Sequence, residues 1–284
     1  MVELSADGER VVVDYGPVHM NIWAWNGGGL NLDVAKKGGE RVAGLLDEVA
    51  QYQVVIKQKS RLLRVSRVLP PIVARMIESS KVVDDPDFTP LATVAGTFAD
   101  FVADHILDSG ADKVIVDNGG DIAIRVPPGE SIRIGIRSDL SSTTTTHVIT
   151  INGDMGIGGV CTSGLGGRSL TLGIATAAVA LSPSASLADG AATLLGNVTY
   201  IDSPKVKRML AESIYPDTDV RGLMVVTEVE PLSDEEIEKA LSLGEKKAQE
   251  LLNKQVITGA FIAVQGDTRN IGNIGALISP LNLN

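Results

Sequence analysis

Three short apolar segments, separated by tight turns, lie between residues 113 and 137 and limit the folds open to this chain. The segments are Lys113–Asp117, Ile122–Val126 and Ile132–Arg137. The first turn contains Asn118-Gly119-Gly120, and Asn-Gly is a strong signal for a β-hairpin. The second contains Pro127-Pro128-Gly129. Strands joined by such short turns must run antiparallel, because a parallel connection needs a longer crossover. The sequence therefore predicts an antiparallel sheet here.

Helical patterns accompany these hairpins. Apolar residues recur at helical spacing from Leu91 to Leu107. A capping box, Ser233 to Glu236, predicts a helix that continues to Asn253. A third helix is predicted only from about Glu40, because Gly38 and Gly39 precede it. Hairpins interspersed with helices predict an α+β fold, in which helices pack on a mostly antiparallel sheet.

Further strands are predicted at residues 9–25 (two strands), at 148–151, near 170–174 and 177–181, and at 223–229 and 258–265. Residues 141–146 and the glycine-rich passage 156–168 are predicted to be loops. No linker demands a boundary, so the sequence predicts a single domain over residues 1–284.

Charge and composition limit the function classes. The 284 residues carry a formal net charge of -10, which argues against a nucleic-acid footprint and an anionic membrane surface. No apolar run reaches transmembrane length, and the N-terminus has no secretory apolar region. A single cysteine excludes an internal disulfide framework. We therefore expect a soluble cytoplasmic protein, and a homo-oligomer is one of the assemblies that the sequence allows.

The segment Ser184–Leu195 carries one carboxylate and one hydroxyl among small residues. Asp189 and Thr193 are four positions apart, so they share one face of a helix. Mg²⁺ prefers oxygen ligands and shares them with substrate phosphates. The pair is thus a candidate metal site. The alternative is that Asp189 caps or precedes a helix, or sits in its first turn where the helix dipole favours a negative charge, while Thr193 packs.

Two glycine-rich segments are candidate ligand-binding elements. Gly119, Gly120 and Asp121 could let a backbone approach a ligand, or could simply form a hairpin turn. Thr162, Ser163, Gly164 and Arg168 could cradle a phosphate with backbone N–H groups and a guanidinium, or could form a surface loop. Together with the Asp189 pair, they predict one pocket for a small phosphate-bearing ligand.

Two other features have competing interpretations. Cys161 is either a buried small side chain or, as a candidate catalytic residue, a reactive or sulfur-carrying thiol. The Arg61–Arg67 cluster is either a solvated face or an interface, and we favour the solvated face.

Several of these segments together resemble the ApbE family, magnesium-dependent flavin transferases that move FMN from FAD onto a protein threonine. The matching segments are residues 93–104, Asn118–Ile122, Ile134–Arg137, Val160–Gly164 and Ser184–Leu195. The resemblance implies an ApbE-like fold related to the T-fold. It also implies FAD or FMN as ligand, with Mg²⁺ bound by Asp189 and Thr193.

The chain is more similar to a smaller ApbE-like family of methanogenic archaea and anaerobic bacteria. The segments Asp87–Gly96 and Thr162–Ser169 carry this similarity, which implies a link to sulfur assimilation and homocysteine formation. Ala99 stands where the flavin transferases have a lysine, and their H-x-x-D-P-x-T-G stretch is absent. Two hypotheses follow: a protein that binds a flavin or nucleotide with Mg²⁺, or a non-catalytic scaffold or partner protein that has lost FMN transfer.

Overall fold

The computed structural model describes residues 3–6, 8–137, 145–165, 167 and 169–281. The chain divides into two compact units, each assembled from several segments. Unit 1 comprises Met1–Ser131, Asn152–Cys161 and Ser182–Gly190. Unit 2 comprises Ile132–Ile151, Thr162–Leu181 and Ala191–Asn284. The single domain expected from the sequence stays a prediction, and the units are described separately.

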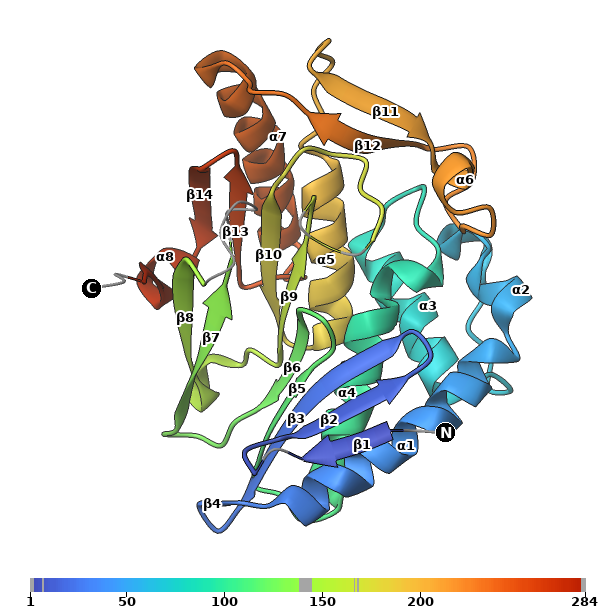
Figure 1. The fold of residues 1–284 in the computed structure, drawn as a ribbon, viewed down its shortest axis with the longest axis vertical. Coiled ribbons are helices and arrows are strands. Elements are labelled where there is room, and N and C mark those ends of the chain that lie inside the picture. Colours follow the sequence, from blue (N-terminus) through green and yellow to red (C-terminus); the bar gives the residue numbers. More distant parts are fainter. Residues whose placement is uncertain (1–2, 7, 138–144, 166, 168, 282–284) are drawn as a thin grey trace. The chain divides into compact units, whose positions relative to one another are not determined.

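The strands of unit 1 form an antiparallel sheet in the order β1-β2-β3-β5-β6-β9 (Figure 1). Their bounds are β1 Glu3–Ala6, β2 Val11–Tyr15, β3 Val18–Asn26, β5 Lys113–Asp117, β6 Asp121–Arg125 and β9 Gly159–Ser163, and the short β4, Gly29–Leu30, pairs with β3. Alternate residues of β3 are buried, as expected for a sheet with one covered face. The predicted hairpin of residues 113–117 with 122–126 is confirmed by the antiparallel pairing of β5 with β6. The third predicted segment does not continue this sheet: β6 pairs next with β9, and β7 (Ser131–Ile136) belongs to a separate three-stranded sheet.

Helices pack against this sheet. The helical segments of unit 1 are α1 Leu32–Ala50, α2 Gln53–Ile56, η1 Ser60–Leu62, α3 Pro71–Val83, η2 Pro90–Thr93, α4 Val94–Asp108 and η3 Gly153–Met155. The helix α1 contacts β2 and β3, α4 contacts β5 and β6, and the two helices contact each other. The predicted helix from Leu91 begins as a 3₁₀ turn, and α-helical geometry starts at Val94.

The predicted start of α1 at about Glu40 is wrong. The helix begins at Leu32, where the Asn31 side chain caps it, and it continues through both glycines. A Cβ atom on Gly38 would lie 2.4 Å from the Ile106 side chain of α4. Gly38 is therefore a packing position between two helices. From the sequence alone, a glycine at such a packing position cannot be distinguished from one that interrupts a helix.

Unit 2 contains an antiparallel group of β10 (Ala177–Ser182), β13 (Gly259–Val264) and β14 (Asp267–Gly272). The strands β7 (Ser131–Ile136), β8 (His147–Asn152) and β15 (Ile278–Pro280) form a second sheet, and β11 (Val206–Leu210) pairs with β12 (Met224–Val229). The short helices are α6 (Ala211–Ile214) and α8 (Ile274–Leu277). Of these strands, β11, β14 and β15 were not predicted. The predicted loop at 141–146 falls largely outside the described residues.

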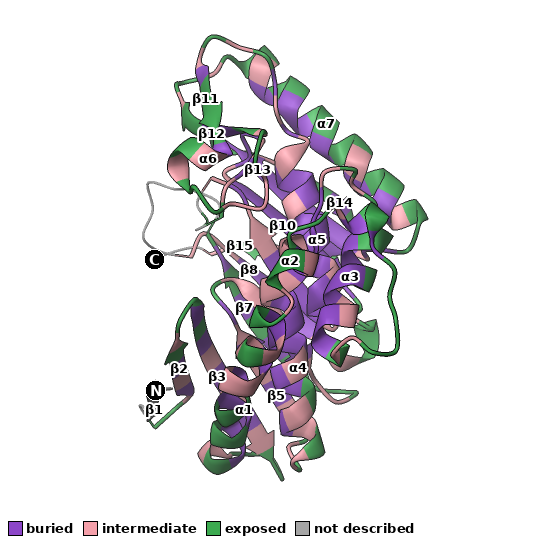
Figure 2. Cartoon of the chain, turned by 90° about the vertical axis from the view of Figure 1, so that its right-hand side faces the viewer, coloured by how far each residue is buried: buried purple, intermediate pink, exposed green. Residues whose placement is uncertain are grey.

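The helix α7 (Asp234–Asn253) confirms the capping-box prediction. The Ser233 hydroxyl accepts from the N–H of Glu236, and the Glu236 carboxylate accepts from the N–H of Ser233. One side of α7 is buried, and its contacts are to β13 and β14 (Figure 2). The helix α5 (Ala185–Asn197) contributes residues 185–190 to unit 1 and residues 191–197 to unit 2.

The predicted strand at 170–174 is wrong. In that segment, side-chain oxygens accept the backbone hydrogen bonds that a neighbouring strand would otherwise accept. The N–H of Leu172 donates to the Asn197 side chain, and those of Ile174 and Ala175 donate to the Thr199 hydroxyl, each at 2.9 Å. A Cβ atom added at Gly173 would lie 2.0 Å from the Gly196 carbonyl oxygen. The segment is thus an irregular stretch whose backbone groups are satisfied by side chains.

Candidate functional site

Asp189 lies in the first half of α5, and its carboxylate contacts the N-terminus of a different helix. Its Oδ2 accepts a hydrogen bond of 2.9 Å from the N–H of Gly96, in the first turn of α4. The residue is buried, with 9% of its surface exposed. A carboxylate at this place satisfies a backbone donor that has no partner within α4 and interacts favourably with the helix dipole.

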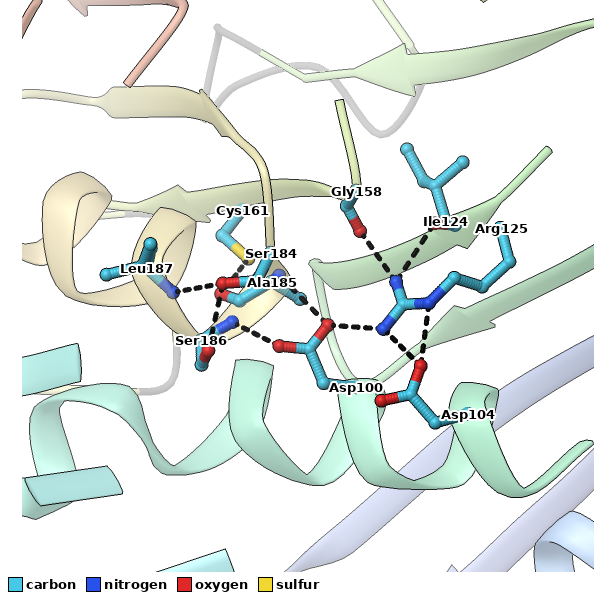
Figure 3. Close-up of polar contacts among 10 residues, drawn as sticks. All are labelled: Asp100, Asp104, Ile124, Arg125, Gly158, Cys161, Ser184, Ala185, Ser186 and Leu187. Atoms are coloured by element: carbon cyan, nitrogen blue, oxygen red, sulfur yellow. Dashed lines mark hydrogen bonds and ion pairs between the residues drawn. The ribbon is translucent and has the colours of Figure 1, made fainter. Parts of the chain in front are cut away.

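Asp100 makes the reciprocal contact from α4 to α5. Its Oδ1 accepts from the N–H of Ala185 at 3.1 Å, and its Oδ2 accepts from the N–H of Ser186 at 2.9 Å (Figure 3). The Ser184 hydroxyl accepts from the N–H of Leu187 at 3.3 Å. Each helix therefore has its N-terminus capped by a carboxylate of the other helix. Sequence reasoning missed Asp100. The available signal was a carboxylate within the apolar face of a predicted helix, where a charge needs a partner.

Arg125 of β6 provides the countercharge for Asp100. Its Nη2 lies 3.0 Å from Asp100 Oδ1, and both Nη2 and Nε contact Asp104 Oδ1, at 2.7 and 2.8 Å (Figure 3). Its Nη1 donates to the carbonyl oxygens of Ile124 and Gly158. The Asp100 side chain is fully buried, and that of Arg125 is 19% exposed. The guanidinium thus neutralises a buried carboxylate while it satisfies two carbonyl groups.

The two helices approach closely at glycine positions. A Cβ on Gly96 would lie 2.2 Å from the Ala185 carbonyl oxygen and 2.8 Å from the Asp189 Cβ. A Cβ on Gly159 of β9 would lie 2.3 Å from the Ala185 Cα. These positions admit only glycine unless the backbones separate. The close approach allows short carboxylate side chains to reach the opposite helix terminus.

The glycine turn between β5 and β6 reaches the same end of α4. Gly119 and Gly120 have positive φ angles of 70° and 104°, and the N–H of Gly120 donates to Asp117 Oδ1 at 2.8 Å. The Asn118 side chain donates to the Ala95 carbonyl oxygen at 3.1 Å. The segment is therefore a hairpin turn that also contacts α4. Sequence reasoning had selected Gly119, Gly120 and Asp121, but not Asn118.

The second glycine-rich segment belongs to unit 2. The predicted loop over 156–168 is wrong at Gly159–Ser163, which form strand β9, and Thr162 and Ser163 end that strand. Gly164 has a φ of 132°, and the N–H of Gly167 donates to its carbonyl oxygen at 3.0 Å. Arg168 lies outside the described residues. The predicted convergence of this segment with the turn at Gly119 stays a prediction.

Cys161 is fully buried and its Sγ donates to the Ala185 carbonyl oxygen at 3.3 Å. Burial raises the pKa of this thiol, and the negative charges of Asp121, Asp189 and Asp100 raise it further. A raised pKa keeps the sulfur protonated, whereas a nucleophile or metal ligand must be a thiolate. The surroundings therefore favour the interpretation of Cys161 as a small buried side chain over the catalytic one.

A comparison with protein families gives the membership of this chain. A family model described as "AbpE bacteria" matches residues 2–270. The chain belongs to this ApbE-like family. Relatives of this ApbE-like protein include UPF0280 proteins of methanogenic archaea. That of Methanothrix thermoacetophila is 39% identical over 47% of this chain and 54% of its own length. That of Methanococcoides burtonii is 37% identical over 55% of this chain and 64% of its own length. The matches thus span little more than half of these relatives.

Solved structures confirm the α+β, ApbE-like fold. The flavinyl transferase ApbE of Pseudomonas stutzeri, in its apo form, matches with a TM-score of 0.52 and 15% identity over 97% of both chains. The ApbE protein of Thermotoga maritima matches with a TM-score of 0.51 and 11% identity over 98% of this chain and 99% of that one. At this identity the likeness concerns the fold alone.

None of the described helices combines the length and the apolar character needed to cross a membrane. In the same part of the chain, no group of three or more His, Cys, Asp or Glu side chains could hold a metal ion.

Burial raises the pKa of Asp189 to about 7. The N–H groups of Gly96 and Ala95 oppose this shift, and the negative charge of Asp100 adds to it. A carboxyl group in an unfolded chain titrates near pH 3.9. Between about pH 4 and 7 the folded protein therefore holds a proton that the unfolded chain has lost. The stability that this proton contributes is fully present below about pH 4 and is lost as the pH rises to about 7.

The Asp189→Asn variant tests this titration. The amide does not ionise. The difference in the free energy of unfolding, variant minus wild type, should therefore increase as the pH rises from 5 to 7. The slope of the difference should be at most about 1.4 kcal/mol per pH unit. Urea unfolding at several pH values measures it, with Asp154→Asn, at an exposed turn, as the control. A difference between wild type and Asp189→Asn that stays constant with pH would contradict the raised pKa.

Proposed function

We propose that this chain binds a phosphate-bearing flavin or nucleotide together with Mg²⁺, and that binding depends on Asp189. The observation that carries the proposal is the state of this carboxylate: it is buried, its pKa is raised to about 7, and it lies at the end of α4 that Asn118 also contacts. Perturbed carboxyl groups of this kind are common at functional sites. A divalent cation would stabilise the charged form of Asp189 and attract an anion.

The available donors fit Mg²⁺. Asp189 supplies carboxylate oxygen, and Thr193, half-buried on the same helix, supplies a hydroxyl. Mg²⁺ often uses one or two protein oxygens and completes its shell with water and substrate phosphates. Bound there, it would supply positive charge for the phosphate oxygens. The N-termini of α4 and α5 already accept carboxylates, so they have little capacity left for a phosphate.

The finer parts of the proposal rest on the family resemblance. They are the phosphate contacts of Thr162, Ser163, Gly164 and Arg168, a cytoplasmic location, and a role in anaerobic sulfur assimilation or homocysteine formation. The flavin itself is suggested by the flavinyl transferase of Pseudomonas stutzeri, whose fold this chain shares. Since the Cys161 thiol is buried and protonated, we do not route any sulfur chemistry through it.

A second candidate function is a scaffold or partner protein without chemistry of its own. The reciprocal capping favours it, because Asp189 already has a structural role at the N-terminus of α4. Asparagine caps helices about as well as aspartate but carries no charge. The same variant therefore distinguishes the two functions.

Calorimetric titration of FAD, FMN and ADP into the protein, with and without Mg²⁺, tests the proposed function. We expect affinity for at least one ligand to rise with Mg²⁺, and Asp189→Asn to weaken that binding more than tenfold without unfolding the protein. The control is Glu235→Gln, an exposed carboxylate in the first turn of α7. If none of the three ligands binds under either condition, the scaffold function stands instead.

A further inference from the structure

A basic segment interrupts the acidic character of this chain. Residues 49–77 contain no Asp or Glu, although the whole chain has 35 acidic residues. The same stretch contains Lys57, Lys59, Arg61, Arg64, Arg67 and Arg75. Lys59 pairs with Asp87 at 3.1 Å. Within the described residues no ion pair involves the exposed Arg61, Arg64 or Arg67. We define the basic segment as residues 53–69, which carries these three free arginines.

The basic segment also exposes aliphatic side chains. Val54, Leu62 and Val68 are 80%, 71% and 86% exposed, more than any other large hydrophobic residue that the structure describes. Val65 adds a fourth, at 40%. Single exposed aliphatic residues are common on proteins, but a group of them among unpaired arginines indicates an interaction surface. In Figure 2, α2, which begins this segment, faces the viewer and shows exposed residues.

Several contacts hold the basic segment against unit 1. Within the segment, Ile56, Ser60 and Leu63 are buried. The N–H of Ser60 donates to the Phe88 carbonyl oxygen at 2.8 Å, and Lys81 Nζ donates to the Leu63 carbonyl oxygen at 2.5 Å. The arginines and aliphatic side chains are therefore displayed by an anchored segment.

The composition of the segment indicates its partner. Residues 53–69 contain no Phe, Trp or Tyr. Single-stranded nucleic acids are bound by stacking on aromatic rings, and protein hot spots are rich in Trp and Tyr while Val is scarce there. A symmetric contact between two copies would place arginines against arginines. By contrast, aliphatic side chains among cations suit a phospholipid surface, which requires no shape complementarity.

We propose that the basic segment binds peripherally to membranes that contain anionic phospholipids. The side chains of Val54, Leu62 and Val68 enter the interface, and Arg61, Arg64 and Arg67 contact the lipid phosphates. The net charge of -10 does not prevent this contact, because charges more than about 8 Å from the surface are largely screened at physiological ionic strength. This binding is independent of the proposed nucleotide site. It also replaces the interpretation of Arg61–Arg67 as a merely solvated face.

Co-sedimentation of the full chain with vesicles tests the proposal. The probes are vesicles of phosphatidylcholine alone and vesicles that also contain about 30 mol% phosphatidylglycerol. The anionic lipid gives the second set a negative surface potential. We expect binding to the anionic vesicles only, and weaker binding at higher salt. Each arginine near an anionic surface contributes about a fivefold change in affinity. The triple variant Arg61→Gln/Arg64→Gln/Arg67→Gln should therefore bind roughly 100-fold more weakly.

Two further variants decide between lipid and other partners. Leu62→Ser/Val68→Ser keeps every charge and should weaken vesicle binding several-fold. The matched control Arg133→Gln/Lys239→Gln/Lys246→Gln removes three exposed cations of unit 2 and should leave binding within about twofold. Equal losses in both triple variants, or no preference for anionic vesicles, would overturn the proposal. So would polyglutamate binding to the protein together with unchanged vesicle binding of Leu62→Ser/Val68→Ser, because that result would indicate an acidic protein partner.

Discussion

Replacing Asp100 by alanine is expected to lower the free energy of unfolding by about 3–5 kcal/mol. The substitution removes the buried anionic partner of the Arg125 guanidinium, which would keep the half-exposed Asp104 as its counterion in this cluster. It also leaves the N–H groups of Ala185 and Ser186 without their acceptor at the start of α5. Losing a helix cap and breaking a buried ion pair each destabilise a protein, and here one side chain provides both interactions.

Urea unfolding, followed by circular dichroism, measures this loss. Asp100→Asn keeps an oxygen acceptor for the helix terminus while it removes the charge, so we expect about half the effect. Asp104→Ala is the matched control, because it removes the other partner of Arg125 from a side chain that is 52% exposed. Its cost should be about 1 kcal/mol or less. If Asp100→Ala and Asp104→Ala lose the same stability, the capping of α5 by Asp100 is not an important contribution.

The elements that the sequence predicts well are those with local causes. The turn at Gly119-Gly120 and the capping box at Ser233 each place a few neighbouring residues in one conformation. The predictions for the start of α1 and for residues 170–174 were wrong because contacts with residues distant in sequence decide both. At Gly38 the decisive contact comes from Ile106 of another helix, and at Leu172 it comes from the Asn197 side chain. Such contacts between distant residues leave no periodic signal in the chain.

The candidate site was likewise only partly predictable from the sequence. The spacing of Asp189 and Thr193 and the motif resemblance directed attention to α5 from sequence alone. The structure adds what spacing does not contain: Asp189 contacts Gly96, and Asp100 makes the reciprocal contact to Ala185. The alternative interpretation, in which Asp189 caps or begins its own helix, is wrong: α5 begins four residues earlier, at Ala185, and the carboxylate instead caps α4. A cap supplied by another helix cannot be recognised from local sequence.

The Gly96→Ala substitution should destabilise the protein by about 3 kcal/mol or more. Alanine normally favours a helix interior by up to about 1 kcal/mol over glycine. At Gly96, however, the added Cβ would lie 2.2 Å from the Ala185 carbonyl oxygen, and a backbone atom cannot move aside as a flexible side chain can. The two helices would have to separate, which would weaken the hydrogen bonds of both Asp189 and Asp100.

Gly44→Ala in α1 provides the control. Its Cβ would meet only the end of the Arg41 side chain, with Nη1 at 2.8 Å, and that guanidinium can move. We therefore expect Gly44→Ala to stabilise the protein by up to about 1 kcal/mol while Gly96→Ala destabilises it, although both sites are helical glycines. Thermal and urea unfolding of the two variants measure the contrast. Equal behaviour of the pair would show that the approach of α4 to α5 is looser than the distances at Gly96 require.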